Sequence, residues 1–490
     1  MKSTDTTPNF TPAPANHRFL SSEQNSYQYA NLYGFASELY DQIKNLQFSR
    51  SSPLLIISPS SEELVFLVSA AFLLRVPVIT MHYESTEKEI LQLTDKVEPA
   101  AIFATKDLES SRLKSIPHLD IPDYKSAQKK EWNNEHFSLS HTDETAGLFL
   151  TSGSSGSPKI VPVKRRQVLI AAHSSAKNFK PGKNKYWLLC LPLNHVGGIN
   201  VIYRSLLYQS AIYIVQPFDE LIIRELLYSN KDFEVASMVP TMLEKLMEDK
   251  LFRVHFDFKA ILLGGGPITL PFVDRALTRG LPIVSSYGMT ETCAQIAANP
   301  LLQPSGIYIP KTSVGKPFAP NRVEVRDEQG KSVLPNESGQ IWLKGPQVFD
   351  GYFDSRLNKT GFDENGWFNT GDFGHMNRKG HLFIESRRTD LILTGGENVT
   401  PTEVETVLND CPEIRESAVI GIPDQKWGQK VVAFISPANK NIDRKEVEKH
   451  LKKNLKRYQI PKELILIAAI PKTDLGKIKR KKLIQLYKSR

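Results

Sequence analysis

The sequence predicts an α/β protein with a large N-terminal domain of parallel and mixed sheets with helices plus a small β subdomain, followed by a small, mobile α+β C-terminal domain. Short apolar runs alternate with helix-patterned segments up to about residue 290, which is typical of βαβ units around a parallel sheet. From about residue 320 to 385, short runs that alternate apolar and polar residues indicate antiparallel strands. A chain of 490 residues also exceeds the size of one simple core, so two or three domains are expected.

The N-terminal third of the chain shows the alternation of strands and helices most clearly. Residues 1–25 are polar and rich in Pro, Asn and Ser, so we expect them to be disordered or loosely attached. The stretch 108–143 is polar and weakly patterned and is expected to form surface loops. Between these two stretches, the apolar spacing predicts helices at 30–46, 61–75 and 87–95 and strands at 53–58, 77–80 and 100–104.

The alternation resumes after residue 145 and changes character near residue 320. The first part predicts a helix at 197–208 and strands at 147–150, 186–191, 211–215, 236–239, 260–263 and 282–286. The second part predicts strands at 322–325, 339–343 and 382–384, then a helix at 401–408, strands at 416–420 and 431–435, and a basic helix at 443–456. We therefore expect one domain at 1–389, of which about 320–389 is the β-rich subdomain, and a second domain at 390–490.

Composition excludes several classes of protein. The three cysteines, Cys190, Cys293 and Cys411, are widely separated and form no CxxC pattern, which argues against a disulfide scaffold or zinc site and fits a reducing compartment. The longest apolar run, 64–74, is too short to span a bilayer, and the first 30 residues lack the layout of a signal peptide. A cytoplasmic protein without a membrane span is therefore expected.

Positive charge is concentrated at the C-terminal end. Residues 441–490 hold 16 Lys/Arg against 5 Asp/Glu, whereas the whole chain has a net charge of +9. No helix-turn-helix, zinc-finger or RNA-binding signature accompanies these charges, so we expect no nucleic-acid partner. A solvated lysine-rich surface accounts for most of the charge, and a polyphosphate ligand is the more specific interpretation of the rest.

A Gly/Ser/Thr-rich segment follows the strand expected at 147–150. Its two glycines allow sharp turns and close backbone approach, and its five hydroxyls and backbone N–H groups can surround phosphate oxygens. It is not a Walker A loop, because G-x-x-x-x-G-K-[ST] is absent. Taken alone it could also be a flexible linker. Its residues include Thr151, Ser152, Gly153, Ser154, Ser155, Gly156 and Lys159.

Four further motifs follow this segment in the chain: Tyr287-Gly288-Met289-Thr290-Glu291, Thr370-Gly371-Asp372, Ser386-Arg387-Arg388-Thr389-Asp390 and Pro471–Lys477. The five motifs, in this order, resemble those of the acyl-adenylate-forming superfamily, which includes acyl-CoA synthetases, peptide-synthetase adenylation domains and luciferases. Further phrases, such as 192–198, 263–267, 394–398 and 424–429, are most similar to the o-succinylbenzoate–CoA ligase family of menaquinone biosynthesis. The resemblance covers about residues 50 to 485.

The resemblance implies a ligase that forms an acyl-AMP and pyrophosphate from ATP and a carboxylic acid, then transfers the acyl group to CoA. ATP and CoA are then substrates, and Mg²⁺ is the cofactor. Glu291 would hold Mg²⁺ with help from Thr151, which suits an ion that prefers oxygen ligands. A carboxylate can accept hydrogen bonds from ribose hydroxyls, as the family's Asp does. The further implied roles are Lys477, Thr290 and His195 in catalysis, Gly265, Tyr287, Gly288, Met289, Asp372 and Arg387 in nucleotide binding, Asp390 as the hinge, and Gly395 and Gly396 in the CoA channel.

Three of these residues have ordinary alternatives. An acid such as Glu291 is also favoured at a helix N-terminus by the helix dipole, and a turn aspartate such as Asp372 often serves only its turn. Lys477 would be a surface lysine without the resemblance. Two positions depart from the family pattern, with Ser386 where a glycine is usual and Gln340 where an acid is usual. The charges around 455–462 are a further candidate for binding the CoA phosphates.

The acyl pocket is the part that the resemblance specifies least. It implies lining by His195, Gly198, Ile199, Arg204, Gly264, Gly265, Gly266 and Ser286. Because o-succinylbenzoate has a second carboxylate, we predict that Arg204 pairs with it; the alternative is an arginine on the helix surface. A CoA ligase for another aromatic or fatty acid, a carrier-loading adenylation enzyme and a nucleotide-binding protein without catalysis stay open, as does assembly into a homo-oligomer.

Overall fold

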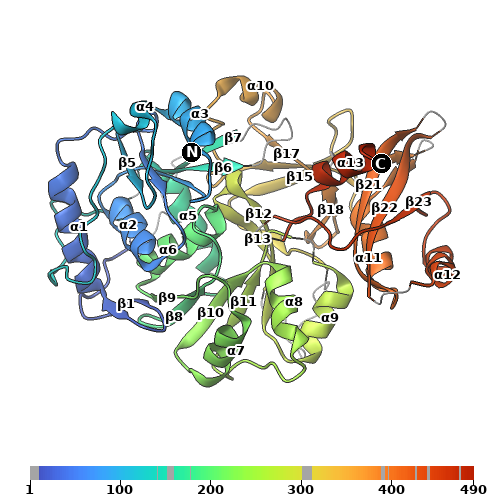
Figure 1. Ribbon diagram of the computed structural model, residues 1–490, viewed down its shortest axis with the longest axis horizontal. Helices are drawn as coiled ribbons and strands as arrows, with labels where there is room; N and C mark the ends of the chain where they lie inside the picture. The colour runs from blue at the N-terminus through green and yellow to red at the C-terminus, as the bar shows by residue number, and fades with distance from the viewer. Residues whose placement is uncertain are drawn as a thin grey trace.

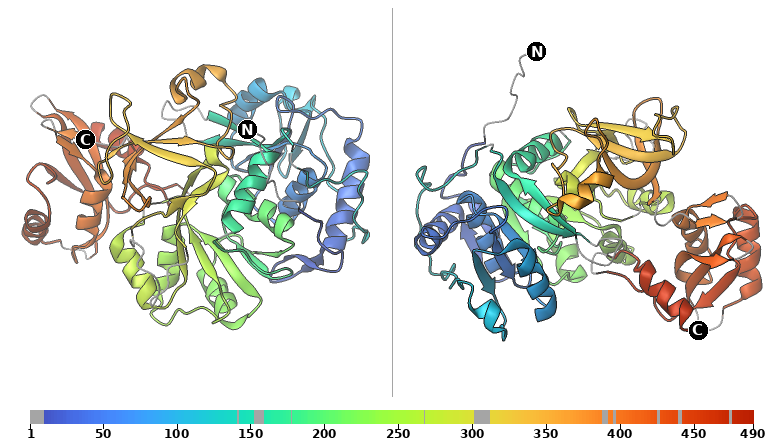
Figure 2. Two further views of the ribbon diagram at one scale, coloured as in Figure 1. Left: turned by 180° about the vertical axis from the view of Figure 1, so that it is seen from behind. Right: turned by 90° about the horizontal axis from the view of Figure 1, so that it is seen from above.

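The computed structural model describes residues 10–140, 142–151, 159–176, 178–266, 268–300, 312–387, 392–394, 397–424, 427–438, 442–473 and 476–490. Four sheets organise the described chain. Two of them share the larger, blue-to-yellow part of the molecule, the third lies between this part and the orange-to-red lobe, and the fourth belongs to that lobe (Figure 1). The view from above separates this lobe from the rest most clearly (Figure 2).

The first sheet has five strands in the order β5-β3-β4-β6-β7, and all neighbours except β6 and β7 run parallel. Strand β3 is buried at all four positions, as expected where helices cover both faces of a parallel sheet. Helix α2 begins after Ser61, whose hydroxyl accepts a hydrogen bond from the Leu64 N–H at 3.2 Å and so caps the helix. The bounds are β3 Leu54–Ile57, α2 Glu62–Leu73, β4 Val78–Met81, α3 Glu87–Val97, β5 Ala101–Ala104, β6 Thr145–Thr151 and β7 Lys159–Lys164.

The second sheet has nine strands in the order β14-β13-β12-β11-β10-β8-β9-β1-β2, and its centre from β12 to β9 is parallel. Its strands are β1 Arg18–Ser21, β2 Ser26–Gln28, β8 Tyr186–Leu189, β9 Ala211–Ile214, β10 Phe233–Met238, β11 Ala260–Leu263, β12 Ile283–Met289, β13 Ala294–Ala298 and β14 Lys316–Pro317. The helices of this region are α1 Tyr29–Ile43, α5 Arg165–Ala176, α6 Val196–Tyr208, α7 Glu220–Ser229, α8 Pro240–Glu248 and α9 Leu270–Thr278. The parallel α/β prediction is confirmed.

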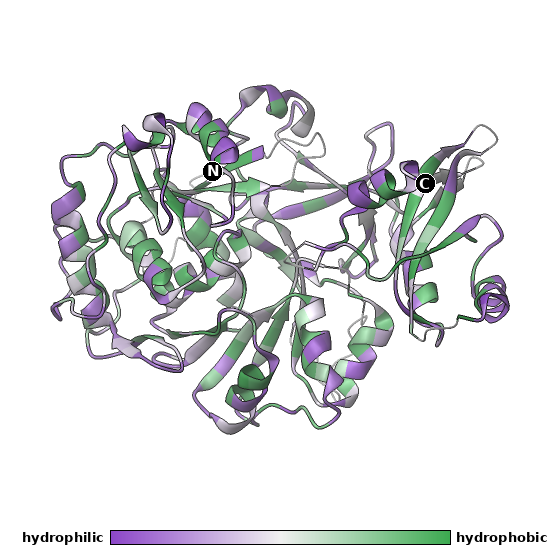
Figure 3. Ribbon diagram, in the orientation of Figure 1, coloured by the Kyte–Doolittle hydropathy of each residue, from purple (hydrophilic) through white to green (hydrophobic). Residues whose placement is uncertain are grey.

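One apolar core joins the two large sheets. Buried residues of α2, α5 and α6 pack with residues of both sheets in a single cluster that includes Phe66, Val168, Ile199 and Trp187. The hydropathy colouring shows green segments gathered on these inward-facing elements (Figure 3). No helix in the described part of the chain is long and apolar enough to cross a membrane.

The prediction that residues 1–25 are disordered or loosely attached is wrong for residues 10–25. Strand β1 runs parallel to β9, with Leu20 opposite Ile212, and Phe19 and Leu20 are completely buried. Arg18 also pairs with Asp232, with 2.7 Å between Nη1 and Oδ2. The strand has only four residues in a polar segment, so its two apolar side chains gave too short a pattern to predict it.

The stretch 108–143 forms loops, as expected, but it is not wholly at the surface. Its one regular element in the described residues is α4, Ser111–Lys114, while Phe137 and Leu139 are buried in the core. The Ser138 N–H donates to the Leu73 carbonyl at 2.9 Å, and the buried Arg165 donates to the Ser138 carbonyl at 2.7 Å. One backbone bond to Leu73 and the Arg165 side chain, which also donates to the Phe72 carbonyl at 2.6 Å, therefore fasten this loop to α2 without a strand.

The third sheet is antiparallel, in the order β15-β16-β17-β18, which confirms the expectation for residues 320 to 385. Its strands are β15 Arg322–Arg326, β16 Gly339–Lys344, β17 Phe368–Met376 and β18 Leu382–Arg387. The connection between β16 and β17 carries two short helices, η2 Ser355–Leu357 and α10 Asn358–Gly361.

The C-terminal lobe has its own sheet and its own core. The sheet runs β20-β19-β22-β21, with β23 added beside β22, and α11 packs on it through Val404 and Leu408. The elements are β19 Ile392–Thr394, β20 Glu397–Val399, α11 Pro401–Asn409, β21 Ile414–Asp424, β22 Gly428–Pro437, α12 Arg444–Asn454, β23 Glu463–Leu466 and α13 Arg480–Lys488. The helices and strands expected here are confirmed.

Candidate functional site

The Gly/Ser/Thr-rich segment connects two antiparallel strands, β6 and β7. Thr151 ends β6, Lys159 begins the antiparallel β7, and the two residues are partners in the ladder. Residues Ser152, Gly153, Ser154, Ser155 and Gly156 lie outside the described residues. The structure therefore fixes the two ends of the predicted phosphate loop. Strand β7, which places Lys159, was not predicted.

Glu291 lies in the short helix η1, Thr290–Thr292, directly after β12. Its backbone carbonyl accepts a hydrogen bond from the Phe349 N–H at 2.8 Å. Its carboxylate Oε1 accepts one from the Tyr352 hydroxyl at 2.9 Å. The Nζ of Lys159 lies 4.7 Å from the centroid of the same tyrosine ring, within cation–π range. The fold thus brings together the predicted phosphate lysine and the predicted metal-binding glutamate.

Tyr352 is a residue of this site that the sequence did not reveal. It is separated from Glu291 by 61 residues and lies in the loop that follows β16. The Gly-Tyr-Phe sequence around Tyr352 is typical of an ordinary core residue. No nearby residue in the sequence indicates that Tyr352 contacts Glu291 and Lys159. Only the packing of this loop against η1 and β7 makes it part of the site.

Tyr287 and Asp372 are joined directly. The Tyr287 hydroxyl donates to Asp372 Oδ2 at 2.6 Å, and both residues are almost fully buried. Tyr287 is on β12 and Asp372 on β17, so the bond links the nine-stranded sheet to the antiparallel sheet. Arg387 is the ladder partner of Asp372 on β18. Its side chain lies outside the described part, so the ribose site that the two residues would share stays a prediction.

The glycines of the predicted nucleotide and acyl motifs lie at the ends of two neighbouring parallel strands. Gly264, Gly265 and Gly266 follow β11, and Ser286 on β12 donates from Oγ to the Leu263 carbonyl at 2.8 Å. A Cβ at Gly288 would overlap the Ala294 carbonyl of β13, so only glycine fits there. The next residues along β12 and η1 are Met289 and Thr290. Open α/β sheets bind ligands at this carboxyl end of the strands.

His195, Gly198 and Ile199 lie at the start of α6, where His195 is the N-terminal cap residue. The predicted helix at 197–208 is confirmed. His195 is half-buried, and Gly198 and Ile199 are buried. These residues lie beside β8. The contact of His195 with the acyl carboxylate stays a prediction.

Arg204 is not on the helix surface. The side chain is completely buried, and its Nη1 donates to Gln295 Oε1 at 2.9 Å. Within the described part of the chain, Arg204 Nε, Arg204 Nη2 and Gln295 Nε2 have no hydrogen-bond partner, and burial lowers the pKa of the guanidinium. Gln295 is the ladder partner of Gly288. All three of these groups are donors, and buried donors are ordinarily paired with an acceptor.

The loop that carries Lys477 reaches from the C-terminal lobe to the larger part. Its turn is held by the Thr473 N–H donating to the Lys477 carbonyl at 2.8 Å and by the Lys477 N–H donating to Thr473 Oγ1 at 3.1 Å. Gly476, with φ of +73°, packs so closely against Thr241 of α8 that a Cβ there would overlap the Thr241 side chain. Helix α8 begins at Pro240, next to Gly266, so the loop lies at the carboxyl end of the parallel strands.

Some predicted residues cannot be placed. Asp390, Gly395 and Gly396 lie outside the described residues, as does the side chain of Ser386. The other departure, Gln340, is buried and accepts a hydrogen bond from Asn369 Nδ2 at 2.9 Å. It satisfies its neighbour as an acid would, without adding charge.

In the described residues, no group of three or more His, Cys, Asp and Glu side chains could form a metal cage. Mg²⁺ does not need one, because it is commonly held by one or two carboxylates with water and substrate phosphates. Glu291 offers an oxygen ligand near the predicted phosphate loop. The donor set present therefore fits Mg²⁺ bound together with a polyphosphate.

The fold and this site define a class, and the chain belongs to the AMP-binding enzyme family. Residues 9–353 match that family, and residues 403–477 match the AMP-binding enzyme C-terminal domain. The chain is 31% identical to 2-succinylbenzoate–CoA ligase of Bacillus subtilis over 94% of this chain and 93% of that one. It is 33% identical to the enzyme of the same name from Listeria monocytogenes over 89% of each chain.

Solved structures agree. The B. subtilis o-succinylbenzoate CoA synthetase in complex with its acyl-adenylate intermediate aligns with a TM-score of 0.83, 29% identity and coverage of 96% of this chain and 95% of that one. The same enzyme with ATP and magnesium ion aligns with a TM-score of 0.82, 28% identity and coverage of 97% and 100%.

Proposed function

We propose that this chain is an AMP-forming acid–thiol ligase that converts 2-succinylbenzoate, ATP and CoA into 2-succinylbenzoyl-CoA, AMP and pyrophosphate in menaquinone biosynthesis. One observation carries the proposal: groups suited to phosphate, metal, ribose and catalysis converge at one end of the parallel strands. Lys159 and Glu291 meet at Tyr352, Asp372 is held by Tyr287, and the Lys477 loop docks beside them. The two relatives named above carry the same activity in their names.

The first half-reaction joins two anions, so neutralising charge is the main problem. A carboxylate oxygen of the acid forms a bond to the α-phosphorus while the bond from that phosphorus to the pyrophosphate oxygen breaks. Lys159 supplies positive charge to the leaving phosphates, and Lys477 supplies it near the α-phosphate, which Thr290 contacts. Mg²⁺, held through Glu291 with help from Thr151, offsets phosphate charge when bound.

Asp372 and Tyr287 act on the nucleoside. Because the Tyr287 hydroxyl donates to Asp372 Oδ2, the carboxylate is held in place, and we assign it to the ribose hydroxyls. Arg387 on the neighbouring strand shares the ribose, and Tyr287 and Gly265 lie beside the adenine. In the second half-reaction the CoA thiol attacks the acyl carbonyl and AMP leaves, with Gly395 and Gly396 lining the thiol channel.

The acid has two carboxylates, of which the aliphatic one is activated. We assign the aromatic one to Arg204 and Gln295. Their three unpaired donor groups would be satisfied by a carboxylate, which has only acceptors, and an ionised partner makes such bonds stronger. His195, Gly198, Ile199, Gly264, Gly266 and Ser286 form the remaining wall of the acyl pocket.

Two half-reactions need two arrangements of the lobes. We infer domains at 1–389 and 390–490 with Asp390 as the hinge, because the sheet that begins at β19 contains only later residues. The docking of the Lys477 loop on α8 corresponds to the arrangement for adenylation. Hinges of this kind absorb their motion in a few residues.

The test is pyrophosphate release with ATP, Mg²⁺ and a panel of 2-succinylbenzoate, benzoate, coumarate and medium-chain fatty acids, followed by detection of the CoA thioester. We expect the highest kcat/KM with 2-succinylbenzoate and a stoichiometric CoA thioester. A higher kcat/KM with another acid would show that this acid, and not 2-succinylbenzoate, is the substrate. Pyrophosphate release without CoA consumption would favour a carrier-loading enzyme, and no release with any acid would refute adenylation.

A further inference from the structure

Tyr352 contacts the two charged residues of the phosphate site from one position. Its hydroxyl donates to Glu291 Oε1 at 2.9 Å, and its ring faces Lys159 Nζ at 4.7 Å from the centroid. In the described part of the chain, Lys159 forms no ion pair within 4.0 Å with any carboxylate, Glu291 included, and Glu291 Oε2 has no protein donor. The tyrosine thus lies against both the cation and the anion while they stay unpaired.

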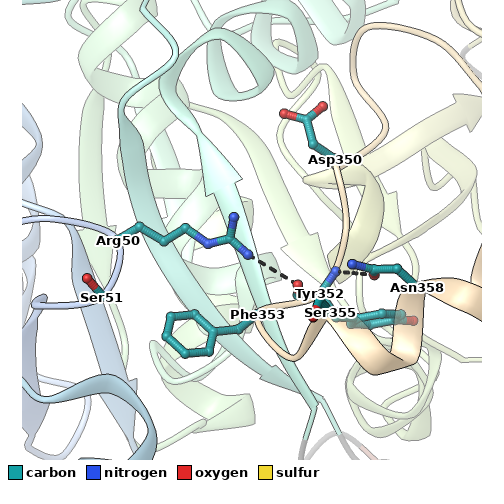
Figure 4. A pocket seen from close by; sticks show the side chains of 7 residues that line it. All are labelled: Arg50, Ser51, Asp350, Tyr352, Phe353, Ser355 and Asn358. Atoms are coloured by element: carbon teal, nitrogen blue, oxygen red, sulfur yellow. Dashed lines mark hydrogen bonds between the residues drawn. The ribbon is translucent and has the colours of Figure 1, made fainter.

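The tyrosine is held rigidly in this place. Its carbonyl accepts a hydrogen bond from Arg50 Nη2 at 3.1 Å, and its N–H donates to Asn358 Oδ1 at 2.8 Å. Figure 4 shows both bonds at the rim of a cavity of about 390 Å³ that lies on the backbone side of the tyrosine. On the other side its ring meets Phe349 edge-on, with centroids 4.8 Å apart, and the residue is 5% exposed.

The chemistry of the ring explains why both charges stay available. A lysine and a glutamate that contact the same side chain attract each other, and an ion pair between them would neutralise each before its ligand arrived. An aromatic face attracts the ammonium through its quadrupole but takes none of its three N–H donors. The hydroxyl fixes one carboxylate oxygen and leaves the second to a metal ion.

We propose that Tyr352 is a positioning residue that keeps Lys159 and Glu291 apart, directing the lysine to the phosphates and the glutamate to Mg²⁺. This inference rests on the proposed ATP-dependent function. It assigns to Tyr352 a role that is exerted through its two neighbours, so its effect must appear in metal dependence and not in folding alone.

The experiment compares Tyr352→Phe and Tyr352→Leu in the full chain. The phenylalanine keeps the ring beside Lys159 and removes the hydroxyl, while leucine removes both. Tyr487→Phe is the matched control, because the Tyr487 hydroxyl also donates to a carboxylate, Glu463 Oε1, at 3.0 Å but lies in the C-terminal lobe. ATP binding is measured by calorimetry with EDTA and over a Mg²⁺ titration, and pyrophosphate release is measured over the same titration.

With Tyr352→Phe we expect unchanged ATP affinity in EDTA and about a tenfold rise in the Mg²⁺ concentration needed for half-maximal tightening, the usual size of an effect on metal affinity from an outer-shell partner. With Tyr352→Leu we expect the same rise and, in EDTA, an ATP affinity weakened by about two- to fivefold from the lost cation–π contact. Tyr487→Phe should match the parent protein in both measurements.

An unchanged Mg²⁺ midpoint in Tyr352→Phe would overturn the inference, as would an equal loss of ATP affinity with and without metal in both variants. If Tyr352→Leu does not fold, the phenylalanine variant decides alone. Failure of the proposed function is distinguishable, because the parent chain would then neither bind MgATP nor release pyrophosphate with any acid.

Discussion

The hydroxyl of Tyr287 donates to Asp372 Oδ2 at 2.6 Å, although the two residues are 85 positions apart. The bond crosses from the end of a parallel strand to an antiparallel sheet. It fixes the orientation of the Asp372 carboxylate, which we assign to the ribose. Tyr287, which we place beside the adenine, therefore also supports Asp372. The two motifs therefore work as one unit.

Replacing Asp372 by Ala should raise the KM for ATP by about ten- to a hundredfold, because hydrogen bonds to a charged group contribute about 1.5–3 kcal/mol. The variant should also stop discriminating between ATP and its 2′- or 3′-deoxy analogues. Tyr287→Phe should produce a smaller loss and retain the discrimination. Steady-state kinetics with the three nucleotides checks this, and undiminished discrimination in Asp372→Ala would assign the ribose to another residue.

Lys477→Ala should abolish most acyl-AMP formation while preserving transfer to CoA from supplied acyl-AMP, because the lysine acts on charge at the α-phosphate. We expect the rate of adenylation to fall by about two orders of magnitude or more, because the interaction between the lysine and the phosphate charge is stronger in the transition state than in the ground state. Lys479→Ala, an exposed lysine two residues away, is the control. Equal loss in both half-reactions would contradict the assignment.

Gly476→Ala should slow adenylation, because the new Cβ would overlap Thr241 of α8 and because φ is +73° there. Adding Thr241→Ala removes the overlapping atoms, so the double variant should recover part of the rate. The remaining deficit reports backbone strain, which the second change does not relieve. Single-turnover acyl-AMP formation measures the recovery, and a double variant no faster than Gly476→Ala would show that the two residues do not meet during adenylation.

Arg204→Met should raise the KM for 2-succinylbenzoate at least tenfold, because the buried donors would no longer meet the aromatic carboxylate. The matched substrate is 4-oxo-4-phenylbutanoate, which lacks only that carboxylate. The parent enzyme should prefer 2-succinylbenzoate, and the variant should lose the preference. A variant that keeps it, or unchanged affinity in Arg204→Ala, would make Arg204 a structural residue.

The anchoring of β1 predicts acid-sensitive stability. Hydrogen bonds from Lys185 and from Arg18 hold the pKa of Asp232 below its ordinary value, against the opposing effect of burial. A lowered carboxyl pKa stabilises the fold above the ordinary value and loses that contribution as pH falls through the folded value. Asp232→Asn should therefore lower the Tm near neutral pH, with the difference from the parent shrinking as the pH falls through the lowered pKa of Asp232. A difference that persists in acid would show that charge is not involved.

Burial of the same strand gives a separate test of the N-terminal segment. Leu20→Ala should cost about 2–5 kcal/mol in the free energy of unfolding, as for other large-to-small changes in a core. Gln24→Ala, at an exposed position nearby, should change it by less than about 0.5 kcal/mol. Urea unfolding measures both, and equal small effects would mean that the segment is loosely attached after all.

Sequence reasoning succeeded where the signal was local. The apolar strands and their helices have a periodicity that is set by their own side chains, so elements such as β3, α2 and α6 were placed within a few residues. The motif around Glu291 and the one around Asp372 also carry their chemistry in adjacent residues. Strand β1 was missed because four residues are too few to show a period. Strand β7 was missed because Pro162 interrupts its apolar run, which argues against a strand except at a sheet edge such as this one.

By itself, the sequence determined the α/β class, the order of its elements and the residues suited to phosphate, ribose and metal, because these depend on residue type and short-range pattern. The tertiary structure alone decided which of them meet. Tyr352 joined Lys159 to Glu291, Tyr287 met Asp372, and Arg204 was buried with unsatisfied donors. Such pairs form between distant segments through packing, and no local pattern in the chain encodes that packing.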